Sequence, residues 1–401
     1  MIFFIPLQAL KNLPENLPLT IMVIGYDAKY MFEHAGGLSH YASLSLESLT
    51  KYYPHNHYII YTSHFKNNGM SVNKLLVQPS VHRKSYHCKS LLDRIWPSRM
   101  VFRSCKRHGV QVFHGMFGAL PKGIHRSAMA SVITLGTQLH HHYPEHYSYF
   151  RRHRIDSKLR AHLKHADAIV AMSEFSKKEI CELYGVPHDK VRVIMPVCEN
   201  YYTVSASEQL LEAQREANNL PKKFILAVGN FDSRHNLEKV VEALPLLAQE
   251  DINLVVVGHK NDYFTHLMHL AENLGVKDRI VRIKEINPIA MPAVFRLASV
   301  VCVPSRYECA SLSILRCFET GVPVVAATGS CMEEFGGDAA LYFHPDSAQE
   351  LAQVLQRALG PDRQALLDAA QKQKQKFTSQ RMAQELETLY REVRAKKFEK
   401  K

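Results

Sequence analysis

Short apolar runs and segments with helical periodicity alternate along most of this chain. The apolar runs lack the polar–apolar alternation of a half-exposed sheet, so they are typical of strands covered on both faces. An alternating order of such strands and helices predicts an α/β fold with doubly wound parallel sheets. We predict strands at residues 21–24, 58–61, 110–113, 131–135, 168–172, 191–194, 224–228, 253–257, 280–283, 300–303, 322–326 and 340–343. We predict helices at residues 39–52, 157–165, 177–184, 237–249, 266–274, 290–297, 312–320 and 348–359.

A polar segment between residues 198 and 224 interrupts this series. A chain of 401 residues is long enough for two domains, and each side of the interruption has its own strands and helices. We therefore predict two Rossmann-like domains whose parallel sheets face each other across a cleft. The predicted boundaries are an N-terminal extension at 1–19, a first domain at 20–200, a linker at 201–222, a second domain at 223–378 and a helix crossing between the domains at 379–401.

The chain has a net charge of +12 at pH 7, with histidines counted as neutral. This excess favours an anionic partner, and residues 151–164 contain six Lys or Arg and one Asp. That segment is either the solvated face of a helix or a surface for an anionic membrane. Nucleic acid is not expected, because no aromatic-basic platform accompanies the charge. Eight cysteines, none in a Cys-x-x-Cys pair, favour free thiols in a reducing, cytosolic setting.

Gly36 and Gly37 begin a predicted helix shortly after the first predicted strand. Glycines let the backbone approach a ligand closely, and the N–H groups of a helix N-terminus attract anions. An ordinary strand-to-helix turn explains the pair equally well. The pattern Gly-x-Gly-x-x-Gly is absent, so a dinucleotide cofactor is not predicted.

Two further predicted strands, 224–228 and 253–257, are each followed at once by a glycine, Gly229 and Gly258. Ligands of open α/β sheets bind where the carboxyl ends of the strands meet. Arg234 and His235 lie in the loop that begins at Gly229, and cations at that edge suit a diphosphate. A basic loop beside a capped helix is the alternative interpretation.

A polar loop and a short helix occupy residues 305–321, between two predicted strands. The backbone amides of Ala310, Ser311 and Leu312 begin this helix and can face an anion. Glu308 lies in the loop, where its carboxylate can accept two sugar hydroxyls. A buried ion pair between Glu308 and Arg316 is the structural alternative.

These segments, taken in order, resemble the family 4 glycosyltransferases, which have the GT-B fold of two Rossmann-like domains. The resemblance covers roughly residues 20–390. The matching segments are IGYDAK (24–29), the glycine pair (36–37), YPE (143–145), HADAIVAMSEFSKKEICELYGVPHDKVRVI (165–194), VGNFDSRHN (228–236), VVVGHK (255–260), VPSRYE (303–308), TGVPVVAA (320–327) and GGDAAL (336–341).

The resemblance implies a retaining hexosyltransferase of polysaccharide or lipopolysaccharide biosynthesis. Its partners would be a nucleoside diphosphate sugar (UDP or GDP) and a glycan or lipid-linked acceptor, and it would need no metal ion or cofactor. It would be cytoplasmic, with peripheral contact at the inner face of an anionic membrane. The implied catalytic residues are Glu308 and Arg234. The implied donor-binding residues are Gly36, Gly37, Gly229, Asn230, His235, Gly258, Tyr307, Ala310, Ser311, Leu312, Arg316 and Glu334.

The chain departs from the family pattern at several polar positions. Arg316 stands where the family usually has a second glutamate, His235 replaces a lysine, and Gly136 falls where a histidine is common. An active enzyme with an altered donor site and a catalytically degenerate homologue acting as a partner subunit are both consistent with these changes. The nearby triplet of residues 140–142 is all histidine, but no metal site is expected because no carboxylate or cysteine is spaced to join it.

Overall fold

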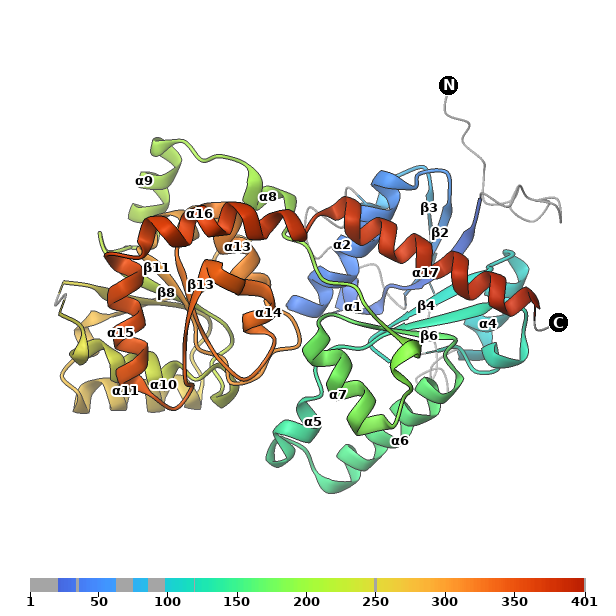
Figure 1. Ribbon diagram of the computed structural model, residues 1–401, viewed down its shortest axis with the longest axis horizontal. Coiled ribbons are helices and arrows are strands. Elements are labelled where there is room, and N and C mark those ends of the chain that lie inside the picture. The colour runs from blue at the N-terminus through green and yellow to red at the C-terminus, as the bar shows by residue number, and fades with distance from the viewer. Residues whose placement is uncertain are drawn as a thin grey trace. The chain divides into compact units, whose positions relative to one another are not determined.

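The computed structural model describes residues 21–33, 36–62, 75–85, 98–118, 120–248 and 251–399. These residues form two compact units (Figure 1). The first unit comprises the described residues up to Pro196 together with those from Ser379 onward, and the second comprises Val197–Thr378. The predicted N-terminal extension at 1–19 lies outside the described residues.

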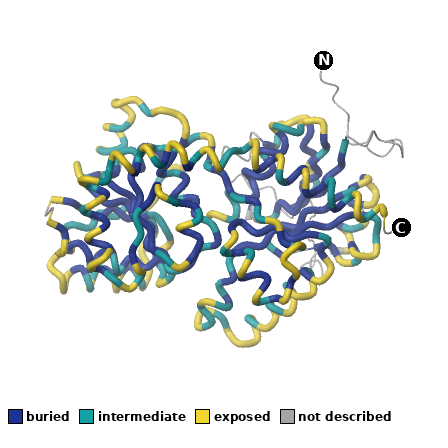
Figure 2. The backbone as a smooth tube through the Cα atoms, in the orientation of Figure 1, coloured by how far each residue is buried: buried dark blue, intermediate teal, exposed yellow. Residues whose placement is uncertain are grey.

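The first unit is built on a parallel sheet with the strand order β3-β2-β1-β4-β5-β6-β7. Apolar strand residues on one face of this sheet form a buried core with apolar residues of α4, α6 and α7 (Figure 2). The strands are β1 Val23–Asp27, β2 His57–Thr62, β3 Val81–Ser85, β4 Val112–Met116, β5 Ala130–Thr134, β6 Ala168–Ala171 and β7 Val191–Val193. The helices are α1 Lys29–Glu33, α2 Gly37–Tyr52, α4 Ser98–Arg107, α5 Leu139–His142, α6 Tyr149–His165, α7 Glu174–Tyr184 and α17 Ser379–Glu399.

The second unit has its own parallel sheet, with the strand order β10-β9-β8-β11-β12-β13, and its own core. The strands are β8 Phe224–Val228, β9 Asn253–Val257, β10 Ile280–Ile283, β11 Val300–Val303, β12 Val324–Ala327 and β13 Ala340–Phe343. The helices are α8 Asn200–Thr203, α9 Glu208–Ala217, α10 Leu237–Ala243, α11 Asp262–Asn273, α12 Met291–Leu297, α13 Leu312–Thr320, α14 Met332–Gly336, α15 Ala348–Leu359 and α16 Arg363–Gln373. Two Rossmann-like domains with parallel sheets are thereby confirmed.

Each predicted strand overlaps an observed one, but β3 was not predicted. Its sequence, Val-His-Arg-Lys-Ser, is mostly polar because β3 lies at the edge of the sheet and, among the described strands, pairs with β2 alone. Helix α10 ends at Ala243, before the predicted end at 249, because Pro245 has no N–H for a helical hydrogen bond.

The unit boundaries differ from those that the sequence indicates. Residues 201–222, treated there as a linker, belong to the second unit, where α9 packs against α12. The C-terminal helix α17 belongs to the first unit, because its apolar face packs against α2, β4 and β5 (Figure 1). The buried residues of that face include Met382, Leu386, Leu389, Tyr390 and Val393.

Candidate functional site

The two predicted catalytic residues, Arg234 and Glu308, are in direct contact in the second unit. Strands β8 and β11 are parallel neighbours, so the loops after their carboxyl ends meet at one edge of the sheet. The Arg234 guanidinium donates to Glu308 Oε1 at 2.7 Å and to the carbonyl of Tyr307 at 3.1 Å. The two charged side chains remain 13% and 20% exposed, which leaves both within reach of a ligand.

His235 and Asp232 hold Arg234 from the other side. The backbone and ring Nδ1 of His235 donate to Asp232 Oδ1, the ring at 2.6 Å, and Arg234 Nη2 lies 2.8 Å from the second ring nitrogen. Burial alone would raise the pKa of Asp232, but hydrogen bonds from His235 and the charge of Arg234 lower it overall. A Cβ at Gly229 would lie 2.6 Å from the His235 ring, so a glycine is needed for the ring to take this position.

The start of α13 lies in the same loop as Glu308. Ser311 occupies the N-cap position without a side-chain capping bond, and the side chains of Tyr307, Ser311 and Leu312 are buried. The side chains of these three residues therefore pack inside the second unit. Ala310 is half-buried.

Glu334, on α14, lies near this loop. Burial raises the pKa of the Cys331 thiol, and the nearby Glu308 and Glu334 carboxylates raise it further, so both carboxylates lie close to this thiol.

Arg316 pairs with Glu199, not with Glu308 as the alternative interpretation of the sequence had it. Its guanidinium forms a two-point ion pair with Glu199 and lies 5.2 Å from the centre of the Tyr202 ring. Burial alone would lower the pKa of Arg316, but the Glu199 carboxylate raises it. The interpretation of Glu308 and Arg316 as an ion pair is therefore wrong. Within the second unit, Glu308 pairs with Arg234 and Arg316 pairs with Glu199.

The predicted glycines divide between the units. Gly36 and Gly37 are exposed in the first unit, where the φ of +125° at Gly36 favours glycine. Gly258 lies in the second unit, with the Phe231 ring 3.2 Å from the position of a Cβ, and Asn230 is exposed there. All other predicted site residues also belong to the second unit.

Gly136, where the family often has a histidine, is closely packed. A Cβ at this position would lie 2.7 Å from a methyl carbon of Leu38 and 3.3 Å from the Phe117 ring. The Gly136 carbonyl accepts a hydrogen bond from the Gln138 side chain at 2.9 Å. The space that a histidine would need is thus occupied by Leu38.

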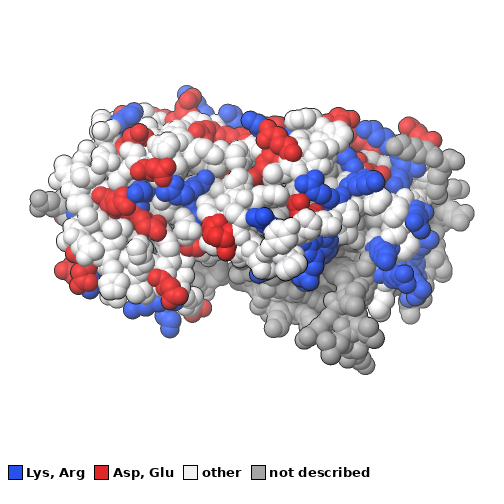
Figure 3. Space-filling view, turned by 90° about the horizontal axis from the view of Figure 1, so that it is seen from below, with Lys and Arg blue, Asp and Glu red and all other residues white. Residues whose placement is uncertain are grey.

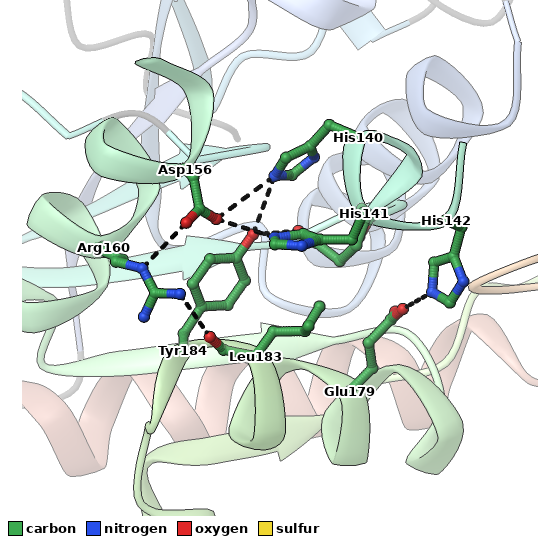
Figure 4. A network of polar contacts seen from close by, with 10 residues as sticks. His140, His141, His142, Asp156, Arg160, Glu179, Leu183 and Tyr184 are labelled. Atoms are coloured by element: carbon green, nitrogen blue, oxygen red, sulfur yellow. Dashed lines mark hydrogen bonds and ion pairs between the residues drawn. The ribbon is translucent and has the colours of Figure 1, made fainter. Parts of the chain in front are cut away.

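The histidine triplet on α5 has carboxylate partners that the sequence spacing did not reveal (Figure 4). His141 Nε2 lies 2.9 Å and His140 Nε2 3.6 Å from Asp156 Oδ1, on α6, while His142 pairs with Glu179, on α7. The reason given for excluding a metal, that no carboxylate is placed to join the triplet, is therefore wrong. Asp156 was missed because its contact depends on how α6 packs beside α5.

Ionisation in this cluster follows from burial and from the neighbouring charges. Burial, together with the nearby His141 ring, lowers the pKa of His140, which leaves that imidazole neutral. Burial alone would raise the pKa of Asp156, but hydrogen bonds from His141 and Arg160 lower it overall. The cluster thus contains the Asp156 carboxylate beside the neutral imidazole of His140.

Comparison with known proteins defines the class to which this fold and site belong. Residues 36–196 match a family model described as Glycosyltransferase Family 4, and residues 210–391 match one described as Glycosyl transferases group 1. The class is thus the glycosyltransferases with the GT-B fold. Within that class, the chain belongs to the family 4 type.

Solved structures agree with the fold. A glycosyltransferase from Rickettsia africae has a TM-score of 0.73 at 17% identity, covering 93% of this chain and 98% of that chain. Sucrose-phosphate synthase from Thermosynechococcus elongatus has a TM-score of 0.74 at 19% identity, with coverages of 93% and 99%. HepE from Anabaena, solved with UDP and glucose, has a TM-score of 0.68 at 18% identity, with coverages of 92% and 99%.

Curated relatives match parts of the chain. O-antigen chain mannosyltransferase B of Escherichia coli is 24% identical over 63% of this chain and 66% of its own length. D-inositol 3-phosphate glycosyltransferase of Corynebacterium aurimucosum is 27% identical over 56% of each. The chain spans between 25% and 66% of the length of the first such relatives.

Proposed function

We propose that this protein is a retaining glycosyltransferase that moves a hexose from a nucleoside diphosphate sugar to a glycan or lipid-linked acceptor. The observation that carries this proposal is the contact between Arg234 and Glu308 at the carboxyl ends of β8 and β11. Both residues lie in the part of the chain that matches the group 1 model. The neighbour HepE, solved with UDP and glucose, supports a nucleotide sugar as donor.

In this proposal, Arg234 and the first amides of α13 stabilise the negative charge that develops on the leaving diphosphate. A guanidinium has five N–H donors, so Arg234 can keep its bond to Glu308 while it binds a phosphate oxygen. Glu308 accepts hydroxyl groups of the donor sugar, and His235 keeps Arg234 in place. This arrangement supplies the positive charge from the protein, so we propose that transfer needs neither a metal ion nor a cofactor.

The experiment titrates the purified chain with UDP and with GDP by calorimetry, then assays transfer from the corresponding sugar nucleotides. The anomeric coupling in the product, measured by NMR, tests retention. We expect Arg234→Met to weaken nucleotide binding about tenfold or more, because a charge-assisted hydrogen bond contributes about 1.5–3 kcal/mol. Glu308→Gln should abolish transfer while it preserves nucleotide binding.

The matched control for this experiment is Arg306→Met. Arg306 lies two residues from Glu308, and its side chain forms a partly exposed pair with Asp346, so its loss should leave binding unchanged. Failure of the wild-type chain to bind either nucleotide would contradict the proposal.

A second candidate function is a non-catalytic partner subunit. It is favoured by the close packing of Leu38 against Gly136 and by the pairing of Arg316 with Glu199, which both occupy positions where the family has polar ligand contacts. Nucleotide binding without turnover of any donor would support this candidate. Turnover that is lost in Glu308→Gln would exclude it.

We also propose that the first unit contacts an anionic membrane. Tyr149 and Phe150, the first residues of α6, are 66% and 83% exposed, and basic side chains follow them at 151, 152 and 154. On the face drawn in Figure 3, Lys and Arg gather over the first unit. Exposed aromatic rings beside cations suit the headgroup region of a bilayer.

This contact would be peripheral, since among the described residues no helix has both the length and the apolar content to cross a membrane. The chain should sediment with vesicles that contain anionic lipid and remain free with neutral ones. The double variant Tyr149→Ser, Phe150→Ser should reduce the bound fraction, whereas Leu210→Ser, at an exposed leucine of α9, should not. Equal binding to both kinds of vesicle would argue against the membrane contact.

A further inference from the structure

Three side chains of the first unit bring metal-ligating atoms together: His140 and His141 of α5, and Asp156 of α6 (Figure 4). Their ligand atoms all lie within 4.8 Å of one another, and the two Nε2 atoms are 3.6 and 2.9 Å from Asp156 Oδ1. Zinc ligands lie about 2.0–2.2 Å from the ion, so two ligand atoms of a tetrahedral site are about 3.4 Å apart. Of the two observed nitrogen–oxygen distances, 3.6 Å is slightly longer and 2.9 Å slightly shorter than this ligand-to-ligand distance.

We propose that His140, His141 and Asp156 form a site for a divalent transition-metal ion, with Zn²⁺ as the preferred ion. Two imidazoles and one carboxylate suit zinc and its transition-metal neighbours, whereas Mg²⁺ and Ca²⁺ prefer oxygen ligands throughout. The ion replaces any proton shared between His141 Nε2 and Asp156, because a histidine ligand must present its lone pair. This inference does not depend on the proposed glycosyl transfer.

The carboxylate ligand of this site is held in place by its neighbours. Asp156 keeps its second oxygen, Oδ2, for a hydrogen bond from Arg160 Nε at 3.1 Å, and Arg160 is also fixed by the carbonyl of Leu183 at 2.8 Å. Outer partners of this kind orient ligating carboxylates. The Tyr184 hydroxyl, 3.4 Å from His140 Nε2, donates to the Gln138 side chain and closes one side of the cluster.

The site has a defined place in the fold. Helix α5 has only four residues, follows the carboxyl end of β5, and is held by α6 through Asp156 and by α7 through the contact of His142 with Glu179. An ion bound by both helices would fasten α5 to α6. Three protein ligands leave a fourth position for water or for an oxygen of a bound molecule, at the sheet edge where α/β proteins bind ligands.

The test measures metal binding directly. The full chain is prepared without a polyhistidine tag, since it already has 23 histidines, and is stripped of metal with a chelator. Zn²⁺ is titrated by calorimetry, and Co²⁺ is titrated with its visible absorption as a report of coordination geometry. We expect one high-affinity site per chain and an intense, tetrahedral Co²⁺ spectrum.

Variants assign the site to its residues. His141→Gln and Asp156→Asn should weaken Zn²⁺ binding at least about tenfold, because even changes to outer partners cost about 10–100-fold. His142→Gln, in the same short helix but outside the three ligands, should bind as the wild type does. Zn²⁺ should raise the melting temperature of the wild type and of this control, but not of the two ligand variants.

His141 is partly exposed, so its replacement leaves the core intact, and circular dichroism checks that each variant is folded. Absence of a one-to-one Zn²⁺ site in the wild type would overturn the inference. Binding that survives in both ligand variants, or that falls equally in His142→Gln, would also overturn it, since the ion would then lie elsewhere.

Discussion

Arg316 and Glu199 form a buried, two-point ion pair in the second unit, with Nε donating to Oε2 at 3.1 Å. Their side chains are 15% and 4% exposed. The pair stands where family 4 glycosyltransferases usually have a second glutamate on this helix. The chain therefore has a guanidinium at that position and brings the carboxylate from the segment that precedes α8.

Removing one partner of this pair should destabilise the second unit. We expect Arg316→Met to lower the free energy of unfolding by about 3–5 kcal/mol, because it leaves the buried Glu199 carboxylate without its counter-charge. The double variant Arg316→Met, Glu199→Gln should recover much of the loss. Urea unfolding followed by circular dichroism measures both.

The control is Lys223→Met, which removes one partner of the exposed pair between Lys223 and Asp251 and should cost less than about 1 kcal/mol. Similar losses in Lys223→Met and Arg316→Met would contradict the structural role of the buried pair.

Gly229→Ala should disturb the candidate donor site through His235. The added methyl would lie 2.6 Å from the His235 ring, so the ring must move and its contact with Arg234 is lost. Overpacking of this kind costs about 1–3 kcal/mol. We expect UDP or GDP to bind about tenfold more weakly, as measured by calorimetry.

The matched control is Gly185→Ala in the first unit. Its Cβ meets no neighbour, but the φ of 64° strains an alanine by about 1–2 kcal/mol. Nucleotide affinity should be unchanged in this variant. An unchanged affinity in Gly229→Ala would show that the position of the His235 ring does not matter for binding.

Acid should destabilise the first unit through its buried histidines. Burial lowers the pKa of His114 to about 3, and its ring nitrogens lie 2.6 Å from the Tyr390 hydroxyl and 2.8 Å from the Thr134 hydroxyl. Between that pKa and the ordinary value near 6.5, the unfolded chain binds a proton that the folded chain does not. The free energy of unfolding therefore falls as the pH falls through this window.

For His114 the loss between pH 7 and pH 5 should be about 2 kcal/mol. Urea unfolding at the two pH values measures it, and the difference should be smaller in His114→Gln, which retains polar contacts but does not titrate. The comparison isolates His114 from other groups, such as His82 and His162, whose pKa values burial also lowers. An equal pH dependence in the variant and the wild type would contradict this assignment.

Restoring the family histidine at Gly136 should not increase turnover. The imidazole would have to displace Leu38, whose methyl carbon lies 2.7 Å from the position of the new Cβ. We expect Gly136→His to lower the melting temperature of the first unit without raising the transfer rate. A higher rate would mean that Leu38 moves aside readily and that the altered residue limits catalysis.

The local sequence pattern correctly predicted the strands that are buried on both faces. The apolar runs of β8, β9, β11 and β12 are buried on both faces, so composition alone distinguishes them from loops. Strand β3 escaped prediction because an edge strand need not be apolar. Helices α13 and α15 begin and end at the predicted residues, and the glycine that follows each of them accounts for its end.

The sequence by itself determined the two parallel sheets, their order along the chain and the loop positions of Arg234 and Glu308, because these depend on short-range periodicity and on where strands end. Only the tertiary structure decided which charges meet. Glu199, just before α8, reaches Arg316 across 117 residues, and Asp156 reaches His141 across 15. No spacing rule encodes such contacts, since they depend on how segments that are separated in the sequence pack together.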